Sequence, residues 1–276
     1  MSLIDLILNL AGLLLWMNWR SARFDPLGRR RPATLIGTLR SADTRRLRRW
    51  RQPLALVALL FFRALLYWQI GPAAHWSGTL DLGVIALSFR SDWFAKILVF
   101  SLLSFGLTLG IFYLWLLLLS ILKGPEPFHQ LVRMQLGGMD RWPAAMKCGL
   151  PLLGAAVLWW PASWLLERLH VLPGPVSAAH RPEESLLIGL AGYLTWKFLI
   201  GALLALRLLN SYIYFGRHPF WIYVSATAQT LLKPLGKIPL RVGKVDFAPV
   251  AGIVLVFFIA QFAGRGLSLL YARLPQ

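Results

Sequence analysis

Six stretches of the chain are almost continuously apolar, and polar or basic segments separate them. They lie near residues 2–18, 53–70, 94–122, 150–169, 185–209 and 248–272. A helix needs about 20 apolar residues, or about 17 at the short end, to cross the hydrocarbon core of a bilayer. The pattern therefore predicts an all-α, polytopic membrane protein with six transmembrane helices. The first stretch has neither a preceding basic region nor an obvious small-residue cleavage site, so we expect a retained helix rather than a signal peptide.

The basic residues between these stretches predict an orientation. Loops 19–52, 123–148 and 210–247 carry eleven, four and five Lys and Arg, whereas loops 71–93 and 170–184 carry one each. Cytoplasmic loops are enriched in Lys and Arg. We therefore expect both termini on the outer side and the three basic loops in the cytoplasm, with the helices forming three hairpins.

A proline recurs at a fixed interval in the three hairpins. Pro53, Pro151 and Pro249 are 98 residues apart, and each is followed after the same interval by an aromatic pair. A fixed period indicates a repeated architecture, although chance similarity among apolar helices is the alternative. We predict a threefold repeat with hairpins over 1–75, 94–175 and 185–276. Because the first helical position needs no amide donor, we expect each proline to open its helix.

Composition fits this class and draws attention to one loop. The chain is 57% hydrophobic and 14% charged, against about a quarter charged in soluble domains, and its net charge is +18. Apolar residues at helical spacing in 33–51 predict an amphipathic interfacial helix on the cytoplasmic side, with Trp50 as its anchor. Its cations would bind anionic lipid. They are Arg40, Arg45, Arg46, Arg48, Arg49 and Arg51. A purely topogenic charge run is the alternative, and nucleic-acid binding is disfavoured because the tether and the apolar face already account for the segment.

Charged residues inside the apolar stretches are candidate functional residues, because an unpaired charge in lipid is costly. Asp5 and Arg63 are expected at similar depth in the outer half of the first hairpin, so we predict an ion pair between them. Lys197 and Arg265 have no obvious acid at their depth. Backbone hydrogen bonds, snorkelling, or contact with an anionic lipid or partner remain open for both. Gly106 and Gly110 form a GxxxG motif that permits close helix approach.

The third basic loop and the helix after it contain a punctuated motif. Between Asn210 and Phe258 the motif positions are Pro219, Pro234, Gly243, Asp246 and Pro249. The segment, strongest over 204–260, resembles modules of the YggT (YlmG-like) family of small membrane proteins. It departs from them in having Ala248 where the family usually has serine. From the residues alone, we expect Asp246 to cap the following helix, and an ion-ligand or proton-carrier role is the alternative.

The resemblance implies a function that the residues by themselves do not specify. YggT-like proteins are linked to envelope organisation, cell division and assembly of membrane cytochrome complexes, so the expectation is a noncatalytic scaffold or assembly protein of the bacterial inner membrane. Its partners would be other membrane proteins or further copies of the chain. The alternative is an ion or small-solute transporter or channel in osmotic homeostasis. The sequence lacks P-loop, GxSxG, HExxH and paired-cysteine motifs, and we expect no enzyme activity, cofactor or metal.

Overall fold

The structure is a computed structural model that is mostly helical. It describes residues 3–23, 35–72, 76–122, 124–126, 128–172, 180–213, 218–237, 241–242 and 245–274. Six helical segments are long and apolar enough to cross a membrane. They are Leu3–Ser21, Trp50–Ile70, Phe94–Leu122, Ala144–Arg168, Arg181–Tyr212 and Ala248–Ala272. The predicted six spans are therefore present, and by length and composition they fit an integral membrane protein.

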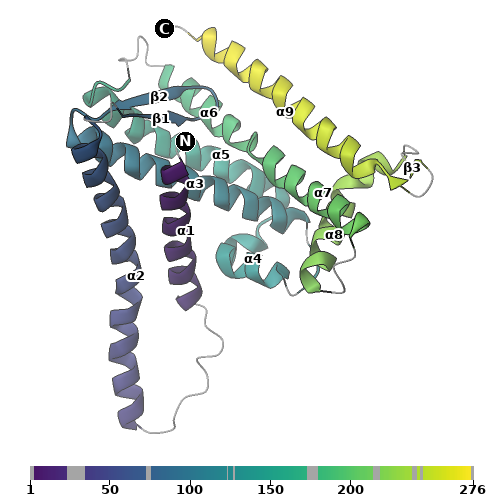
Figure 1. Ribbon diagram of the computed structural model, residues 1–276, viewed down its shortest axis with the longest axis horizontal. Coiled ribbons are helices and arrows are strands. Elements are labelled where there is room, and N and C mark those ends of the chain that lie inside the picture. Colours follow the sequence, from purple (N-terminus) through teal and green to yellow (C-terminus); the bar gives the residue numbers. More distant parts are fainter. Residues whose placement is uncertain are drawn as a thin grey trace. The chain divides into compact units, whose positions relative to one another are not determined.

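The chain divides into two compact units, and the division falls inside the third span. Unit 1 comprises residues 1–80 and 87–110, and unit 2 comprises residues 81–86 and 111–276. Unit 1 contains α1 (Leu3–Arg23), α2 (Leu35–Ile70) and α3 (Phe94–Leu122) as far as Gly110. It also contains most of the two-stranded sheet formed by β1 (Ser77–Asp81) and β2 (Ala86–Arg90). In Figure 1, α1 and α2 lie side by side, as their contacts require.

The core of unit 1 lies where α1, α2 and α3 meet. Leu56, Leu60 and Phe105 are buried there, and Trp16 and Leu109 pack against them. Gly12 sits against this cluster, because a Cβ at that position would meet the Phe105 ring at 2.8 Å. The two strands place their buried side chains in alternation, as expected for a sheet with one covered face. Apolar and polar residues alternate in parts of 77–90, which is typical of strands, but the sequence-based prediction contained helices only.

Unit 2 contains the remaining helices in two packed groups. After the end of α3 come α4 (Phe128–Leu136), the 3₁₀ helix η2 (Gly137–Arg141) and α5 (Ala144–Arg168). α6 (His180–Tyr193) packs along α5, and α7 (Trp196–Tyr212) packs along α9 (Ala248–Ala272) and α8 (Pro219–Leu232). A short 3₁₀ helix, η3 (Lys233–Lys237), and the paired strands β3 (Arg241–Val242) and β4 (Val245–Asp246) complete the unit. The dense α5–α6 packing differs from the predicted pairing of 94–122 with 150–169, and the threefold repeat stays a prediction.

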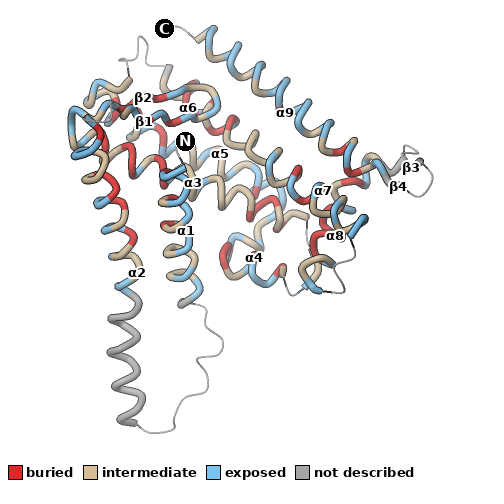
Figure 2. Tube along the Cα trace, in the orientation of Figure 1, coloured by how far each residue is buried: buried red, intermediate tan, exposed pale blue. Residues whose placement is uncertain are grey.

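Two small apolar clusters lie where helices of unit 2 pack against one another. Leu204, Ala228 and Leu232 form one of them at the junction of α7 and α8. Leu116, Leu117, Val132 and Leu136 form the other between α3 and α4. Figure 2 shows buried residues along several helices of this unit, whereas α9 is mostly intermediate or exposed. For a chain whose solvent in the spans is lipid, such apolar exposure is expected rather than anomalous.

The expected role of the repeated prolines is wrong for two of the three. Pro53 lies inside α2 and Pro151 lies inside α5, whereas Pro249 is in the first turn of α9. Helix formation therefore continues upstream of Pro53 and Pro151, at the cost of one lost backbone hydrogen bond each. Near Pro151, the Tyr193 hydroxyl of α6 donates to the Cys148 carbonyl. A side chain from a neighbouring helix thus binds a carbonyl close to the interruption, as membrane helices with internal proline require.

Candidate functional site

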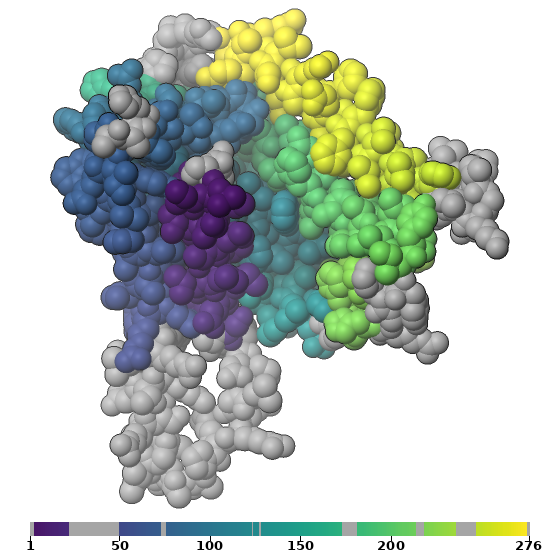
Figure 3. All heavy atoms as spheres, in the orientation of Figure 1, coloured from purple at the N-terminus to yellow at the C-terminus, as the bar shows by residue number. Residues whose placement is uncertain are grey.

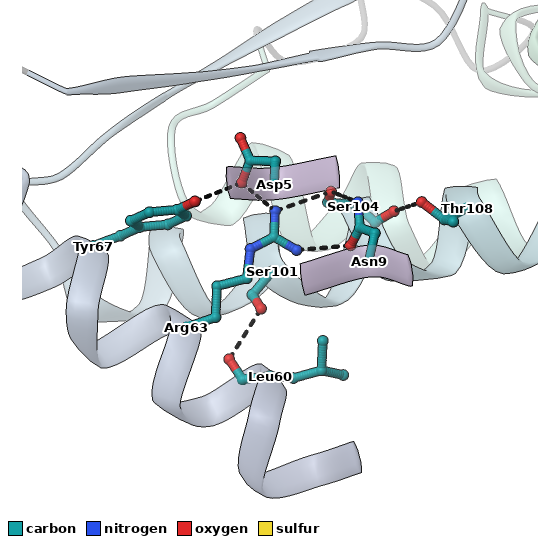
Figure 4. A network of polar contacts seen from close by, with 8 residues as sticks. All are labelled: Asp5, Asn9, Leu60, Arg63, Tyr67, Ser101, Ser104 and Thr108. Atoms are coloured by element: carbon teal, nitrogen blue, oxygen red, sulfur yellow. Dashed lines mark hydrogen bonds and ion pairs between the residues drawn. The ribbon is translucent and has the colours of Figure 1, made fainter. Parts of the chain in front are cut away.

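A buried guanidinium is the centre of the largest polar network in the described part of unit 1. Arg63 on α2 is only 1% exposed. Its Nη2 donates to Asp5 Oδ1 at 2.6 Å, and its Nη1 donates to Asn9 Oδ1 at 2.8 Å. Figure 4 shows that both acceptors come from α1 and point toward the guanidinium. The predicted Asp5–Arg63 ion pair is therefore confirmed, and Asn9 extends it.

Residues of α3 and the next turn of α2 complete this network. Ser104 Oγ lies 3.2 Å from Arg63 Nη2 and accepts a 3.0 Å hydrogen bond from Asn9 Nδ2. The Tyr67 hydroxyl donates to the same Asp5 oxygen that accepts from Arg63, at 2.8 Å. Three helices thus converge on one charge pair, and we call Asp5, Asn9, Arg63, Tyr67 and Ser104 the Arg63 network.

Helical spacing explains how the sequence builds the Arg63 network. Asp5 and Asn9 are four residues apart on α1, and Arg63 and Tyr67 are four apart on α2, so each pair lies on one helix face. The guanidinium also lies over the Phe100 ring, with its central carbon 5.2 Å from the ring centroid. Cation–π contact of this kind gains strength where water is excluded.

The chemistry of the Arg63 network favours a tie between helices over a reactive centre. The guanidinium has N–H donors and no acceptor, so Arg63 acts here as a donor to the oxygens around it. Its charge is matched by Asp5, and the hydroxyl and amide groups around it are engaged with one another. Among the described residues, Arg63 Nε is a buried donor without a partner, and no group of three metal-ligating side chains occurs. Breaking the pair would leave one charge buried alone, which is strongly destabilising.

A second charged cluster joins α3, η2 and α5 in unit 2. Lys147 Nζ donates to Ser120 Oγ at 2.7 Å, and Ser120 Oγ donates to Asp140 Oδ1 at 2.5 Å. Arg133 Nε donates to the other Asp140 oxygen at 3.0 Å. Burial raises the pKa of Asp140. The hydrogen bond from the Ser120 hydroxyl and the nearby cations lower the pKa by more than burial raises it, so the pKa of Asp140 lies below its usual range. Lys147 is buried, and this cluster neutralises its charge.

The fifth span is interrupted between α6 and α7, which the sequence analysis did not predict. Leu194 and Thr195 form a turn instead of continuing the helix. Two indoles bind the interruption to α3: Trp115 Nε1 donates to the Thr195 carbonyl at 3.3 Å, and Trp196 Nε1 donates to the Leu114 carbonyl at 3.2 Å. The Thr195 hydroxyl donates to the Gly192 carbonyl at 2.7 Å. The Thr195 and Gly192 carbonyls at this break therefore already accept hydrogen bonds from side chains of the chain itself.

The structure does not bring Lys197 or Arg265 to an acidic side chain. Lys197 lies just after the break, with its ammonium 5.0 Å from the Phe198 ring centroid. Arg265 is on an exposed face of α9. Within the described residues, neither Lys197 nor Arg265 forms an ion pair. The glycines Gly106 and Gly110 also face open space, so the GxxxG motif makes no close helix contact among the described residues.

The motif positions between Pro219 and Pro249 that the structure describes lie at or near the junctions of short elements. Pro219 opens α8, where His218 Nδ1 accepts a hydrogen bond from the Phe220 amide, and Pro249 lies in the first turn of α9. Pro234 lies in η3. The Asp246 backbone pairs with Arg241 in the β3–β4 ladder. The Asp246 side chain and Gly243 lie outside the described residues, so the capping role of Asp246 stays a prediction.

The basic segment of the first loop is described only in its backbone. Residues 35–49 continue the second span as part of α2, so the predicted interfacial helix is not a separate element. The side chains of Arg40, Arg45, Arg46, Arg48 and Arg49 lie outside the described residues, and Arg51 is exposed. Trp50 is 69% exposed beside it, at the end of the apolar span. An interfacial position of Trp50 stays a prediction.

Several site residues escaped the sequence analysis because they are small or neutral. Asn9, Tyr67 and Ser104 of the Arg63 network carry no net charge, and the screen of intramembrane charges passed over them. Their four-residue spacing from Asp5 and Arg63 was a usable signal for Asn9 and Tyr67. Comparison with protein-family models, with curated proteins and with solved structures gave no match to this chain.

Proposed function

We propose that the chain is a noncatalytic integral membrane scaffold or assembly protein of the YggT type, residing in a bacterial inner membrane. The observation that carries this proposal is the Arg63 network. Arg63, the most buried charged residue of the described spans, forms hydrogen bonds that join three helices of the chain. A rigid support needs buried polar contacts of this kind between its helices. The cluster of Lys147, Ser120 and Asp140 uses charge in the same way.

The proposed orientation places both termini outside and the basic loops in the cytoplasm. The asymmetry of Lys and Arg among the loops supports it. In this arrangement the arginines of residues 40–51 lie on the side of anionic lipid headgroups. The packing of α1 on α2 and of α7 on α9 supports the proposed hairpins in the first and third repeats. Partners would be other membrane proteins or further copies of the chain.

One observation favours the second candidate, an ion or small-solute transporter or channel. Transporters often build their sites at broken helices, and the fifth span is broken at Leu194 and Thr195 with Lys197 close by. In such sites the freed carbonyls coordinate the transported ion. Here the Thr195 and Gly192 carbonyls already accept hydrogen bonds from Trp115 and Thr195. This occupancy, and the cation beside it, favour the scaffold over a cation pathway.

The experiment that separates the two candidates begins with native membranes. We expect purification in mild detergent to give a stoichiometric complex with another membrane protein, and reconstituted vesicles to show ion flux no higher than protein-free vesicles. A chain that emerges alone and conducts ions, with flux changed by Lys197→Gln, would contradict the scaffold and support the transporter. Lys233→Gln, a cation outside the spans, is the matched control for Lys197.

A further inference from the structure

The polar residues of α9 gather on one exposed face. Apart from Tyr271, the polar side chains of this span are Gln261, Arg265 and Ser268, which are spaced by four and then three residues. All three are exposed. At 3.6 residues per turn, this spacing places them in one stripe along the helix. Val254 and Phe258 extend this stripe toward the start of the helix, so that the spacing between successive residues alternates between four and three. We call these five residues the α9 seam.

The five residues of the α9 seam are exposed in the described part of unit 2. Of the six candidate spans, α9 has the smallest buried share, 6% of its most apolar window. Val254 and Phe258 are among its most exposed apolar side chains. Figure 2 draws the helix beyond its first turns mostly as exposed or intermediate, and Figure 3 shows it at the surface (yellow). The inward contacts of α9 with α7 use other positions, such as Gly252 and Phe257.

Polar groups on a lipid-facing helix are unfavourable unless something binds them. Arg265 lies about two turns before the end of the span at Ala272, well inside the apolar segment. Among the described residues it forms no ion pair, and no hydrogen bond occupies the Gln261 amide. Ser268 donates to the Gly264 carbonyl, which leaves its oxygen able to accept. Ionisable residues within spans characteristically face a protein partner and pair with it.

We propose that the α9 seam docks a transmembrane helix of a different membrane protein, which presents a carboxylate opposite Arg265. This inference rests on the proposed scaffold function and names the chemistry of its partner. An alternation of three and four residues is the geometry by which one helix packs along another. The Gln261 amide and the Ser268 hydroxyl supply further hydrogen bonds on either side of the charge pair. Val254 and Phe258 provide apolar contact in the other half of the span.

Charge selects this occupant over a second copy of the chain. A symmetric pair of α9 helices meeting along the seam would bring Arg265 close to the Arg265 of the other copy. Two guanidinium groups in an apolar environment repel each other and have no acid to share. Lys197 does not define such a surface, because its ammonium already lies over the Phe198 ring.

The test places a photo-crosslinking benzoyl-phenylalanine at Ser268 in the full chain, in intact native membranes. The same probe at Leu270, an exposed position roughly 160° around the helix from Ser268, is the control for face. We expect a crosslink to one distinct membrane protein from position 268 and not from position 270. Arg265→Gln should lower its yield by about tenfold or more, whereas Arg265→Lys should retain most of it. Arg273→Gln removes a cation just after the span and should leave the yield unchanged.

Charge reversal decides the pairing. Arg265→Glu should abolish the crosslink, and changing the opposing acid of the captured helix to Arg should restore it. A crosslink to a second copy, to lipid or within the chain would overturn the proposal, as would no crosslink or one insensitive to Arg265→Gln. A complex that purifies intact but ignores Arg265 would refute the seam and leave the scaffold standing. Absence of any complex would instead refute the scaffold.

Discussion

Arg63 Nη2 on α2 lies 2.6 Å from Asp5 Oδ1 on α1, and both side chains are almost fully buried. The closeness of the pair means that neither charge can be removed without leaving the other in an apolar interior. A buried ion pair is therefore weak evidence for net stability but strong evidence that its two members must be kept together.

Replacing either member of the pair should destabilise unit 1. We expect Asp5→Ala or Arg63→Ala to lower the free energy of unfolding by about 3–5 kcal/mol, because each leaves an unmatched charge. The double variant Asp5→Leu with Arg63→Met should lose less than the sum. Denaturant unfolding in detergent micelles measures all three. Asp92→Asn, which breaks an exposed pair with Lys96, is the control and should cost no more than about 1 kcal/mol. Additive losses in the double variant would show that the two residues are not coupled.

The two indoles at the break should hold the fifth span in place. Trp115→Phe and Trp196→Phe each remove one hydrogen bond between α3 and the α6–α7 junction. Interhelical hydrogen bonds in membranes contribute roughly 0.5–2 kcal/mol, so each variant should lose stability in that range. Hydrogen exchange of the Leu194–Phe198 amides should rise in both. Trp93→Phe changes an exposed tryptophan and should leave the exchange unaltered. Unchanged protection at the junction in the two variants would mean that the turn holds by itself.

Acid should weaken the cluster around Asp140. Its pKa lies below the ordinary value of 3.8 in the folded chain, so the folded state binds the proton less readily than the unfolded state. The resulting stabilisation is complete above pH 3.8 and is lost as the pH falls through the folded pKa. Asp140→Asn should therefore be less stable than the unmodified chain at pH 7, and the difference should shrink on acidification below pH 3.8. Unfolding curves between pH 7 and pH 2.5 measure this.

The control for Asp140 is another carboxylate that contacts the same arginine. Glu126 pairs with Arg133 at 3.4 Å, but its side chain is far more exposed than that of Asp140. Glu126→Gln should therefore change stability little at any pH. Equal pH dependence in the Asp140→Asn variant and the unmodified chain would contradict the assignment to Asp140.

Close packing of α5 on α6 should depend on one glycine. A Cβ at Gly189 would meet Leu152 Cδ1 at 2.9 Å and the Leu152 carbonyl at 3.2 Å. Gly189→Ala should lower the free energy of unfolding by roughly 1 kcal/mol and Gly189→Leu by more, because the helices must separate. Gly106→Ala, where nothing lies within 4 Å, should be neutral or stabilising. Equal effects at the two positions would argue against the packing role of Gly189.

The sequence was most informative where one physical requirement acts alone. The length of an apolar helix is set by the bilayer, and all six spans were found from it. The similar depths of Asp5 and Arg63 in the first two spans also predicted their ion pair. Depth says nothing about which faces meet, so it could not supply Ser104 from α3. That contact depends on the rotation of α3, which is fixed by packing around Phe105.

The errors came from rules that describe average helices. Proline is favoured at the first helical position, but residues 35–52 and 144–150 also form helix, so Pro53 and Pro151 became interior residues. The break at Leu194 and Thr195 contains no proline at all. Gly189 and Gly192 precede it, and the Thr195 hydroxyl competes for a backbone carbonyl. Such a break needs donors from α3 to persist in lipid, and no local pattern reveals those.

The interruption of the fifth span has a consequence during synthesis. α6 leaves the ribosome after its neighbour α5, but α7 leaves before α8 and α9. At about 5–20 residues per second, α7 waits for several seconds until α9 is complete. The turn at Leu194 and Thr195 separates α6, which packs on α5, from α7, which packs on α9. The two parts of this span therefore gain their packing neighbours at different times during synthesis.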